Sequence, residues 1–372
     1  MLPIPGLYRI EDVRRIMTPA LLIYPAFVDA NIQATLNMAS GDPNRWRPHL
    51  KTAKIPSVIR RLLDFGVKNF KCSTTLELLT ACEAGAPDVL LAFPVMGANA
   101  SRTREIASSF PATRISVLIE TSRQMEIWKD TSIGIFIDIN PGMNRTGVQQ
   151  DHLTEILDLA MNAGPQFRGI HYYDGHIAGI STSERQDHTQ EGYGHLLRTA
   201  RQLLEAGLAV DEVITSGTPA APYALSYAGF NGAPFTHRIS PGTVVYNDLS
   251  SLEQLPGFGY RPAALVLTTV VSHPTESTVT CDAGHKSVSA DAGVPTCSVL
   301  GYEHLKPLKP SEEHLPITSE SGEGLPEPGE KLYLIPRHVC PTVNNFDEAL
   351  FIADGQVRSI ERVAARGHEQ RS

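Results

Sequence analysis

The sequence predicts an α/β protein, in which an eight-stranded parallel (β/α)8 barrel is followed by an antiparallel β domain. Between about residues 46 and 243, short apolar runs alternate with amphipathic segments, which is the pattern of repeated βα units. After about residue 259, strand-like runs follow one another with no long helix between them. The length of 372 residues suits one large domain and one smaller domain.

The barrel is predicted over residues 26–258. Amphipathic segments typical of surface helices lie between its strand-like runs, for example at 55–66, 75–85, 151–164 and 184–207. A doubly wound open sheet is the alternative architecture for the same alternation. The predicted barrel strands, in chain order, are RWRPHLKTA (45–53), VKNFKCST (67–74), DVLLAFP (88–94), RISVLIE (114–120), IGIFIDIN (133–140), FRGIHYYDG (167–175), DEVITSG (211–217) and HRISPGT (237–243).

The β domain is predicted over residues 259–372, together with residues 1–25. The run TPALLIYP, residues 18–25, could belong to either domain by its pattern, and we assign it here. Residues 306–330 are rich in Pro, Glu and Ser and are predicted to be a solvated loop. The predicted strands are AALVLTTVVS (263–272), STVTCDAG (277–284), CSVLGYE (297–303), KLYLIPRHVC (331–340) and ALFIADGQVRSIERV (349–363).

Charge and composition argue against several classes of partner. The net charge is −8 and the Lys and Arg residues are scattered, whereas a nucleic-acid or membrane-surface protein needs a clustered basic face. No apolar run is long enough to span a membrane, and the N-terminus lacks a signal-peptide core. Five widely spaced cysteines do not suggest a disulfide framework. We therefore expect a cytoplasmic protein.

Lys51 is a candidate nucleophile in the stretch WRPHLKTAK. It lies near the C-terminal end of the first predicted strand. Active sites of βα barrels form at the C-terminal ends of the strands, so this lysine would point into the site from a rigid element. Near other cations, a buried lysine has a lowered pKa and can attack a carbonyl. A solvent-facing lysine is the plain alternative.

Two turns rich in small residues follow the seventh and eighth predicted strands, ITSGTPA at 214–220 and ISPGTVVYND at 239–248. Barrels frequently bind phosphate with the loops after these two strands, and glycine allows the backbone N–H groups to approach the anion. Each turn alone is a weak signal, but both occur at the expected strand ends. The candidate phosphate-binding residues are Ser216, Gly217, Thr218, Gly242 and Thr243.

Further polar residues follow the fifth and sixth predicted strands. Arg145, in IDINPGMNRTGV, could provide a fixed cation, although by itself a surface or capping arginine is the more ordinary reading. Tyr173 and His176, in HYYDGHIAG, could reach the same mouth of the barrel. A neutral histidine near a cation can act as a general base. A lysine nucleophile next to a phosphate site indicates pyridoxal 5′-phosphate (PLP), which bonds lysine and needs its phosphate anchored.

The segment PRHVCPTVNNFD, residues 336–347, suggests a metal site. His338 and Cys340 are two residues apart, so their side chains share one face if the segment is extended. Imidazole and thiolate at this spacing form a plausible half-site for zinc or a related divalent ion. Two protein ligands leave positions open, which suits catalysis. A buried cysteine beside a hydrogen-bonded histidine is the alternative.

The motifs RPHLK, INPGMNRTGV, TSGT, SPGT, DAGHKS and PRHVCPTVN occur in this order. Together they resemble the D-threonine aldolase / D-serine dehydratase family of metal-dependent PLP enzymes, which have the alanine racemase-like fold (PLP fold type III). The resemblance runs from about residue 17 to 367 and implies a homodimer. It implies that Lys51 bonds the cofactor, although Ala53-Lys54 stands where family members usually have a His-Lys pair. By the same resemblance, the cofactor-binding residues are Arg145, Tyr173, Ser216, Gly217, Thr218, Gly242 and Thr243, and the metal (Zn, Mn or Mg) ligands are His338 and Cys340.

The resemblance implies a lyase that acts on D-3-hydroxy amino acids. The tail motif and the loop YDGHI favour D-threonine aldolase-type cleavage to glycine and an aldehyde, with His176 as the candidate base. Cys340 instead favours the alternative, a D-serine or 3-hydroxy-D-aspartate dehydratase that gives a 2-oxo acid and ammonia. An amino-acid racemase of the same fold is a third reading. A cofactor-carrier protein is a fourth, but such proteins typically lack the second domain.

Overall fold

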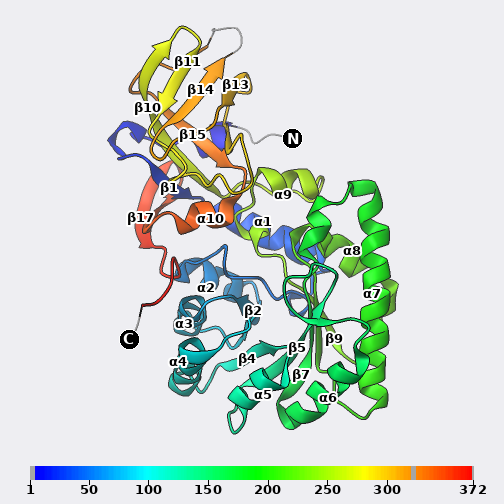
Figure 1. Ribbon diagram of the computed structural model, residues 1–372. Helices are drawn as coiled ribbons and strands as arrows, with labels where there is room; N and C mark the ends of the chain where they lie inside the picture. Colours follow the sequence, from blue (N-terminus) through cyan, green and yellow to red (C-terminus); the bar gives the residue numbers. More distant parts are fainter. Residues whose placement is uncertain (1–4, 320–323, 371–372) are drawn as a thin grey trace. The chain divides into compact units, whose positions relative to one another are not determined.

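The computed structural model of the chain describes residues 5–319 and 324–370 (Figure 1). The chain forms two compact units. One unit contains the described parts of Met1–Ala34, together with Thr52–Val58 and Thr243–Gly367. The other contains Thr35–Lys51, Ile59–Gly242 and the described residues that follow Gly367. We refer to these as the β unit and the barrel unit.

The barrel unit is built on a parallel sheet whose strands follow chain order without reversal. This order excludes the doubly wound sheet, in which the strand order reverses. A two-residue strand, β6 (Val148–Gln149), pairs beside the end of β5. The sheet runs through β2 (Asn69–Cys72), β3 (Asp88–Leu91), β4 (Arg114–Ile119), β5 (Gly134–Asn140), β7 (Phe167–Tyr172), β8 (Glu212–Thr215) and β9 (Thr236–Ile239).

The first predicted strand is not a regular strand in the structure. Trp46 forms a parallel bridge with Ile239 of β9, and His49 forms one with Lys71 of β2. Pro48 has no N–H group to donate, which limits regular pairing at this point. Residues 46–50 nevertheless pair with the strands at both edges of the parallel sheet, so the segment takes the place of an eighth barrel strand.

Helices follow most of the barrel strands and surround the sheet (Figure 1). Thr74 begins one of them by accepting a hydrogen bond from the N–H of Glu77, and Thr121 forms a capping box with Gln124. The predicted helical segments are confirmed. These helices are α2 (Pro56–Asp64), which runs across the division between the units, α3 (Thr75–Glu83), α4 (Gly97–Ser109), α5 (Ser122–Trp128), α6 (Leu153–Ala163), α7 (Thr182–Glu205) and α8 (Ala221–Ser226).

An ionic cluster lies at the N-terminal ends of the barrel strands. Arg47 is 1% exposed and donates two hydrogen bonds of 2.7 Å to Glu212, the first residue of β8. It donates a third, also of 2.7 Å, to Asp88, the first residue of β3. Arg238 pairs with the same glutamate. These contacts tie strands together at the end opposite the candidate site.

The β unit contains a largely antiparallel sheet, as predicted, with one parallel pair between β1 and β16. The run 18–25 contributes β1 to this sheet. The strand order is β13-β14-β11-β10-β1-β16-β17, with β15 pairing to both β10 and β12. The strands are β1 (Ala20–Ile23), β10 (Ala264–Thr275), β11 (Thr278–Cys281), β12 (Cys297–Val299), β13 (Leu305–Pro307), β14 (Leu315–Ser319), β15 (Lys331–Pro336), β16 (Glu348–Ala353) and β17 (Gln356–Arg362).

The prediction of a solvated loop over 306–330 is wrong in part. Strand β14 lies inside this segment and pairs with β11, and the end of β13 overlaps its start. Leu315, Ile317 and Ser319 alternate with more exposed residues, so one face of β14 packs into the core. Residues 320–323 lie outside the described part of the chain. The same unit carries α1 (Pro25–Met38), which ends in the barrel unit, α9 (Leu249–Gln254) and α10 (Val339–Asn344).

All five cysteines are free thiols and are buried. Among the described residues, no helix combines the length and the apolar character that crossing a membrane requires.

Candidate active site

A cavity of about 270 Å³ opens at the C-terminal ends of the barrel strands and contains the half-buried Lys51. Its walls come from the 46–51 segment, from the ends of β2, β3 and β7, and from the turn that follows β5. The prediction that Lys51 lies at this end of the barrel therefore agrees with its position. The lining residues are His49, Lys51, Lys71, Ser73, Ala92, Phe93, Pro94, Arg145, Thr146, His171 and Tyr173.

Arg145 and Tyr173 enter the same cavity from different elements. The guanidinium carbon of Arg145 lies 4.9 Å from the centre of the Tyr173 ring, and the Nζ atom of Lys71 lies 5.3 Å from it. An aromatic face attracts cations through its quadrupole, so the ring holds both basic groups at the cavity wall. With Lys51, these side chains give the cavity a cationic lining.

Sequence reasoning missed an ionisable network on the cavity floor. Lys71 Nζ lies 3.3 Å from Nε2 of His171, and Nδ1 of His171 lies 2.7 Å from Oδ1 of Asp138. Burial, followed by the charge of Lys71, lowers the pKa of His171. Each of the three residues interrupts an apolar strand of the central sheet, where ionisable side chains are rare without a specific role. These ionisable residues within apolar runs are the signal in the sequence that could have revealed the network.

The two glycine-rich turns form a cradle after β8 and β9. The Oγ atoms of Ser216 and Ser240 are buried and have no hydrogen-bond partner among the residues that the structure describes. A Cβ atom at Gly217 would lie 3.0 Å from the Tyr173 ring, and one at Gly242 would lie 2.3 Å from the carbonyl oxygen of His49. Unsatisfied hydroxyls and backbone kept open by glycine fit a phosphate group.

Thr218 and Thr243 each begin a short 3-10 turn, at Thr218–Ala220 and Thr243–Val245. Thr218 is buried next to the cradle in the barrel unit. Thr243 is the first residue of the β unit after Gly242, and its Oγ1 lies 3.4 Å from Sγ of Cys340. The sequence had not indicated Ser240, which supplies the second hydroxyl without a partner.

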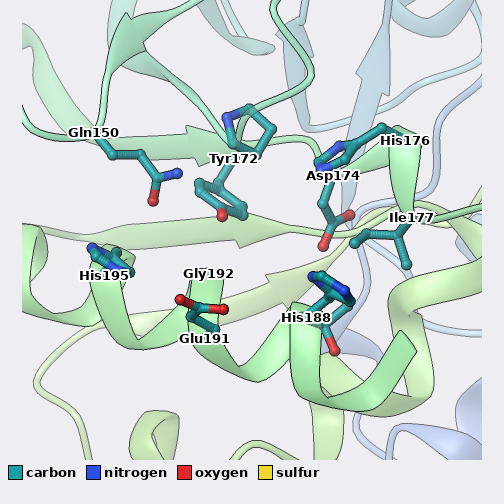
Figure 2. A pocket seen from close by; sticks show the side chains of 11 residues that line it. Gln150, Tyr172, Asp174, His176, Ile177, His188, Glu191, Gly192 and His195 are labelled. Atoms are coloured by element: carbon teal, nitrogen blue, oxygen red, sulfur yellow. The ribbon is translucent and has the colours of Figure 1, made fainter. Parts of the chain in front are cut away.

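The structure does not bring His176 into the Lys51 cavity. It is exposed on the 3-10 turn Gly175–Gly179 and lines a second cavity of about 220 Å³. Figure 2 shows His176, Asp174 and His188 around this second cavity. Side chains alternate at the end of β7, so Tyr173 enters the Lys51 cavity while Tyr172 and Asp174 line the other.

The predicted metal pair lies in the β unit. The expectation of an extended segment is wrong, because His338 immediately precedes helix α10, which contains Cys340. Nδ1 of His338 lies 2.6 Å from Oδ2 of Asp291, and Sγ of Cys340 lies 3.0 Å from Oγ1 of Thr52. Burial opposes charging of His338, but hydrogen bonds and charges from Cys340 and Asp291 raise its pKa to about 9. The first helical turn therefore brings the imidazole and thiol together.

This pair provides an imidazole nitrogen and a sulfur atom, with a carboxylate that orients the imidazole, which suits a borderline-soft divalent ion. In the described part of the chain, no group of three or more His, Cys, Asp or Glu side chains is arranged to hold a metal ion.

Comparison with known families supports the resemblance drawn from the motifs. The family described as "Alanine racemase, N-terminal domain" matches residues 24–249. The chain belongs to this family. A second family, described as "Putative serine dehydratase domain", matches residues 263–352 of this alanine racemase-type chain.

Individual relatives match this alanine racemase-type chain over nearly its whole length. A D-threonine aldolase from Arthrobacter sp is 27% identical over 96% of this chain and 94% of its own length. The crystal structure of D-threonine aldolase from Filomicrobium marinum has a TM-score of 0.86 at 24% identity, covering 98% of this chain and 99% of that one. D-threo-3-hydroxyaspartate dehydratase from Delftia sp. HT23 has a TM-score of 0.81 at 20% identity, covering 96% and 99%. The alanine racemase-like fold predicted from the sequence is confirmed.

Proposed function

We propose that the protein is a PLP- and divalent-metal-dependent lyase that cleaves D-3-hydroxy amino acids to glycine and an aldehyde, as a D-threonine aldolase does. The observation that carries this proposal is the cavity in which Lys51 lies with Arg145 and Tyr173 at the C-terminal ends of the barrel strands. The 27% identity to the Arthrobacter D-threonine aldolase supports the choice of substrate class.

PLP supplies an electron sink that stabilises negative charge on the carbon next to a substrate's amino group. The Nζ atom of Lys51 would bond its aldehyde carbon. The hydroxyls of Ser216 and Ser240, with the backbone of Gly217 and Gly242, would hold its phosphate. Arg145 and Tyr173 would restrict its orientation in the cavity.

His338 and Cys340 would hold the metal ion, and Asp291 would keep the imidazole oriented. Imidazole and thiolate ligands favour zinc over magnesium. A divalent ion at this position would supply Lewis-acid chemistry toward a hydroxyl group and would lower its pKa. His176 is not needed for this assignment, since it lies outside the Lys51 cavity.

A dehydratase is the second candidate, and Cys340 is the observation that favours it. In that reaction the substrate loses water to give an enamine, and the imine form of this product then takes up water and releases ammonia, leaving a 2-oxo acid. The fold shared with D-threo-3-hydroxyaspartate dehydratase is compatible with this alternative. Both reactions begin from the same bound amino acid and differ in which bond to its α-carbon breaks. Product analysis therefore decides between them.

The test is to incubate the PLP-loaded protein with D-threonine and D-serine, with and without EDTA. Glycine plus acetaldehyde from D-threonine is the expected result, whereas a 2-oxo acid plus ammonia would favour the dehydratase. Racemised substrate would indicate a racemase instead. Turnover that survives metal removal would overturn the metal assignment, because the ion is proposed to act on the substrate's hydroxyl.

Borohydride reduction followed by peptide mapping tests the cofactor lysine separately. We expect the label on Lys51, and a label elsewhere would contradict the assignment. Lys51→Met should abolish labelling, and Lys68→Met, which changes an exposed lysine just before β2, should leave it intact. A homodimer is proposed from the family resemblance alone, and sedimentation of the holoenzyme tests it.

A further inference from the structure

Lys71 is a lysine within the central sheet of the barrel unit. It lies in β2, is 2% exposed and lines the same cavity as Lys51. Burial of an ammonium group without a counter-charge is costly, so a buried lysine usually has a carboxylate partner. In the described part of the chain, no ion pair joins Lys71 to a carboxylate. The position therefore needs an explanation other than a structural salt bridge.

The hydrogen bonds around Lys71 define an ordered chain of donors and acceptors. Oδ1 of Asp138 lies 2.7 Å from Nδ1 of His171, and Oδ2 accepts a 2.7 Å hydrogen bond from Thr146. An ionised carboxylate only accepts, so the proton of the neutral imidazole is on Nδ1. The lone pair on Nε2 then faces Nζ of Lys71 at 3.3 Å and accepts a hydrogen bond from it.

The charges near Lys71 favour its neutral form. Burial is the largest cause that lowers the pKa of Lys71, and the positive charge of Lys51 is the next. The carboxylate of Asp138 raises this pKa, but Arg145 and Arg47 lower it again, so that the pKa of Lys71 is about 7. The remaining near neighbour, Tyr173, presents the face of its ring. At neutral pH the amine therefore exists in both protonation states, each of which can use the acceptor on His171.

We propose that Lys71 is a second working lysine of the Lys51 cavity, which donates and accepts protons there while the His171–Asp138 pair holds its amine in place. This role rests on the proposed function for the identity of the substrate. In aldol cleavage, the hydroxyl proton leaves as the carbonyl forms, and the electrons of the broken Cα–Cβ bond remain on Cα, which then takes up a proton. Lys71 can hold one proton between these two events, so the overall reaction is balanced.

The first test uses the protein without cofactor. Lysine isotope-labelled at Cε is incorporated, and the NMR shift of each lysine is followed against pH. We expect one signal with a midpoint near the value of about 7 given by its surroundings, compared with about 10.4 for an ordinary lysine. This signal should be missing in Lys71→Met and retained in Lys68→Met. A Lys71 midpoint above 9 would overturn the proposal.

A second variant keeps the lysine and changes only its surroundings. Asp138→Asn removes the one carboxylate that raises the pKa of Lys71, so the midpoint should move to lower pH. A Lys71 amine that faces solvent instead of this network would have an ordinary midpoint in both proteins. This comparison remains decisive even if Lys71→Met does not fold.

The holoenzyme gives the final test. Loss of a positioned acid–base group lowers the rate by about 10²-fold or more, so the rate of Lys71→Met should fall by at least that factor. The pH profile of the variant should also lack the limb near neutrality, that is, the change in rate that accompanies titration of Lys71. The visible absorbance of bound PLP should also lose its pH dependence in that range. Wild-type rates and an unchanged limb in Lys71→Met would refute the role. If the wild-type protein cleaves no D-3-hydroxy amino acid, the proposed function fails, whereas the NMR and absorbance titrations still decide on Lys71.

Discussion

The guanidinium group of Arg145 lies over the ring of Tyr173, 4.9 Å from its centre, at the wall of the Lys51 cavity. The two residues come from different parts of the barrel unit: Arg145 from the turn after β5, and Tyr173 from the end of β7. The attraction between the guanidinium group and the ring face holds both side chains in place at one side of the proposed cofactor site.

This contact predicts different outcomes for two changes at one position. Tyr173→Phe keeps the aromatic face and should lower PLP affinity little. Tyr173→Leu removes the attraction for Arg145 and Lys71, which is about 1 kcal/mol per partly buried contact, and the loss of both contacts should weaken PLP binding by about 30-fold. Absorbance titration of the cofactor-free variants measures both. Equal losses in the two variants would show that the hydroxyl matters instead.

Ser216 combines backbone strain with a proposed binding role. Its φ of 59° is in the left-handed region, which costs a non-glycine residue about 1 kcal/mol. Ser216→Gly should therefore raise the free energy of unfolding by about that amount and weaken PLP binding through loss of the hydroxyl. Ser216→Ala, the matched control, should weaken binding without any gain in stability. Urea unfolding and PLP titration test the pair, and a Ser216→Gly variant with unchanged affinity would contradict the phosphate role.

Arg47 should be critical for stability because its charge is buried among its partners. Arg47→Met leaves Asp88 without its buried partner and Glu212 with Arg238 alone, and loss of one member of a buried ion pair costs about 3 kcal/mol or more. Arg358 provides the control, since its side chain is 51% exposed and pairs with Asp354 at 3.0 Å. Arg358→Met should cost less than about 1 kcal/mol. Urea unfolding that gives similar losses for both would contradict this account.

Much of the barrel was predictable because its parallel strands are covered on both faces and therefore read as continuous apolar runs. Strands β2, β3, β4, β5, β7 and β8 lie within the runs identified from the sequence, and β9 begins one residue before its run. The two-residue strand β6 lies outside these runs. The run at 45–53 looked similar, but it pairs only through bridges at Trp46 and His49. Strand β14 was missed because Pro, Glu and Ser around it obscured the alternation of Leu315 and Ile317.

The positions of Lys51 and of the two glycine-rich turns in the candidate site were predictable, because both follow from the C-terminal ends of the barrel strands. It was not predictable where a turn decides the direction of a side chain. The 3-10 turn after β7 directs His176 to the second cavity, and the start of α10 brings His338 and Cys340 together. Lys71 gave a signal, but only the folded sheet shows which ionisable residues of other strands face it.

Asp291 should tune metal binding without being one of the two predicted ligands. Its carboxylate lies 2.6 Å from Nδ1 of His338 and so orients the ring. Loss of such an outer partner typically weakens metal affinity by about 10- to 100-fold, and Asp291→Ala should show this in a zinc competition assay, while His338→Ala should lose binding. Glu313→Gln, at an exposed salt bridge with Lys286, is the control. Undiminished zinc affinity in His338→Ala would rule out this site.

Asp174 should make stability depend on pH in a defined window. It is 2% exposed, and burial raises the pKa of its carboxyl from 3.8 to about 6, although the hydroxyl of Tyr193 donates a 2.6 Å hydrogen bond to it. The folded protein therefore binds this proton more tightly than the unfolded chain does. The stabilising contribution is fully present below pH 3.8 and is lost as the pH rises to about 6.

Asp174→Asn cannot ionise and should lack this decline. Relative to wild type, the variant should gain up to about 3 kcal/mol of unfolding free energy as the pH rises from 3.8 to about 6, because the wild-type carboxyl must then ionise in a buried site. Urea unfolding at a series of pH values gives this difference directly, with Asp187→Asn on the exposed face of α7 as the control. If the unfolding free energies of wild type and Asp174→Asn changed with pH in parallel, the carboxyl would ionise as readily in the folded protein as in the unfolded chain. The second cavity would then be far more hydrated than the burial of Asp174 implies.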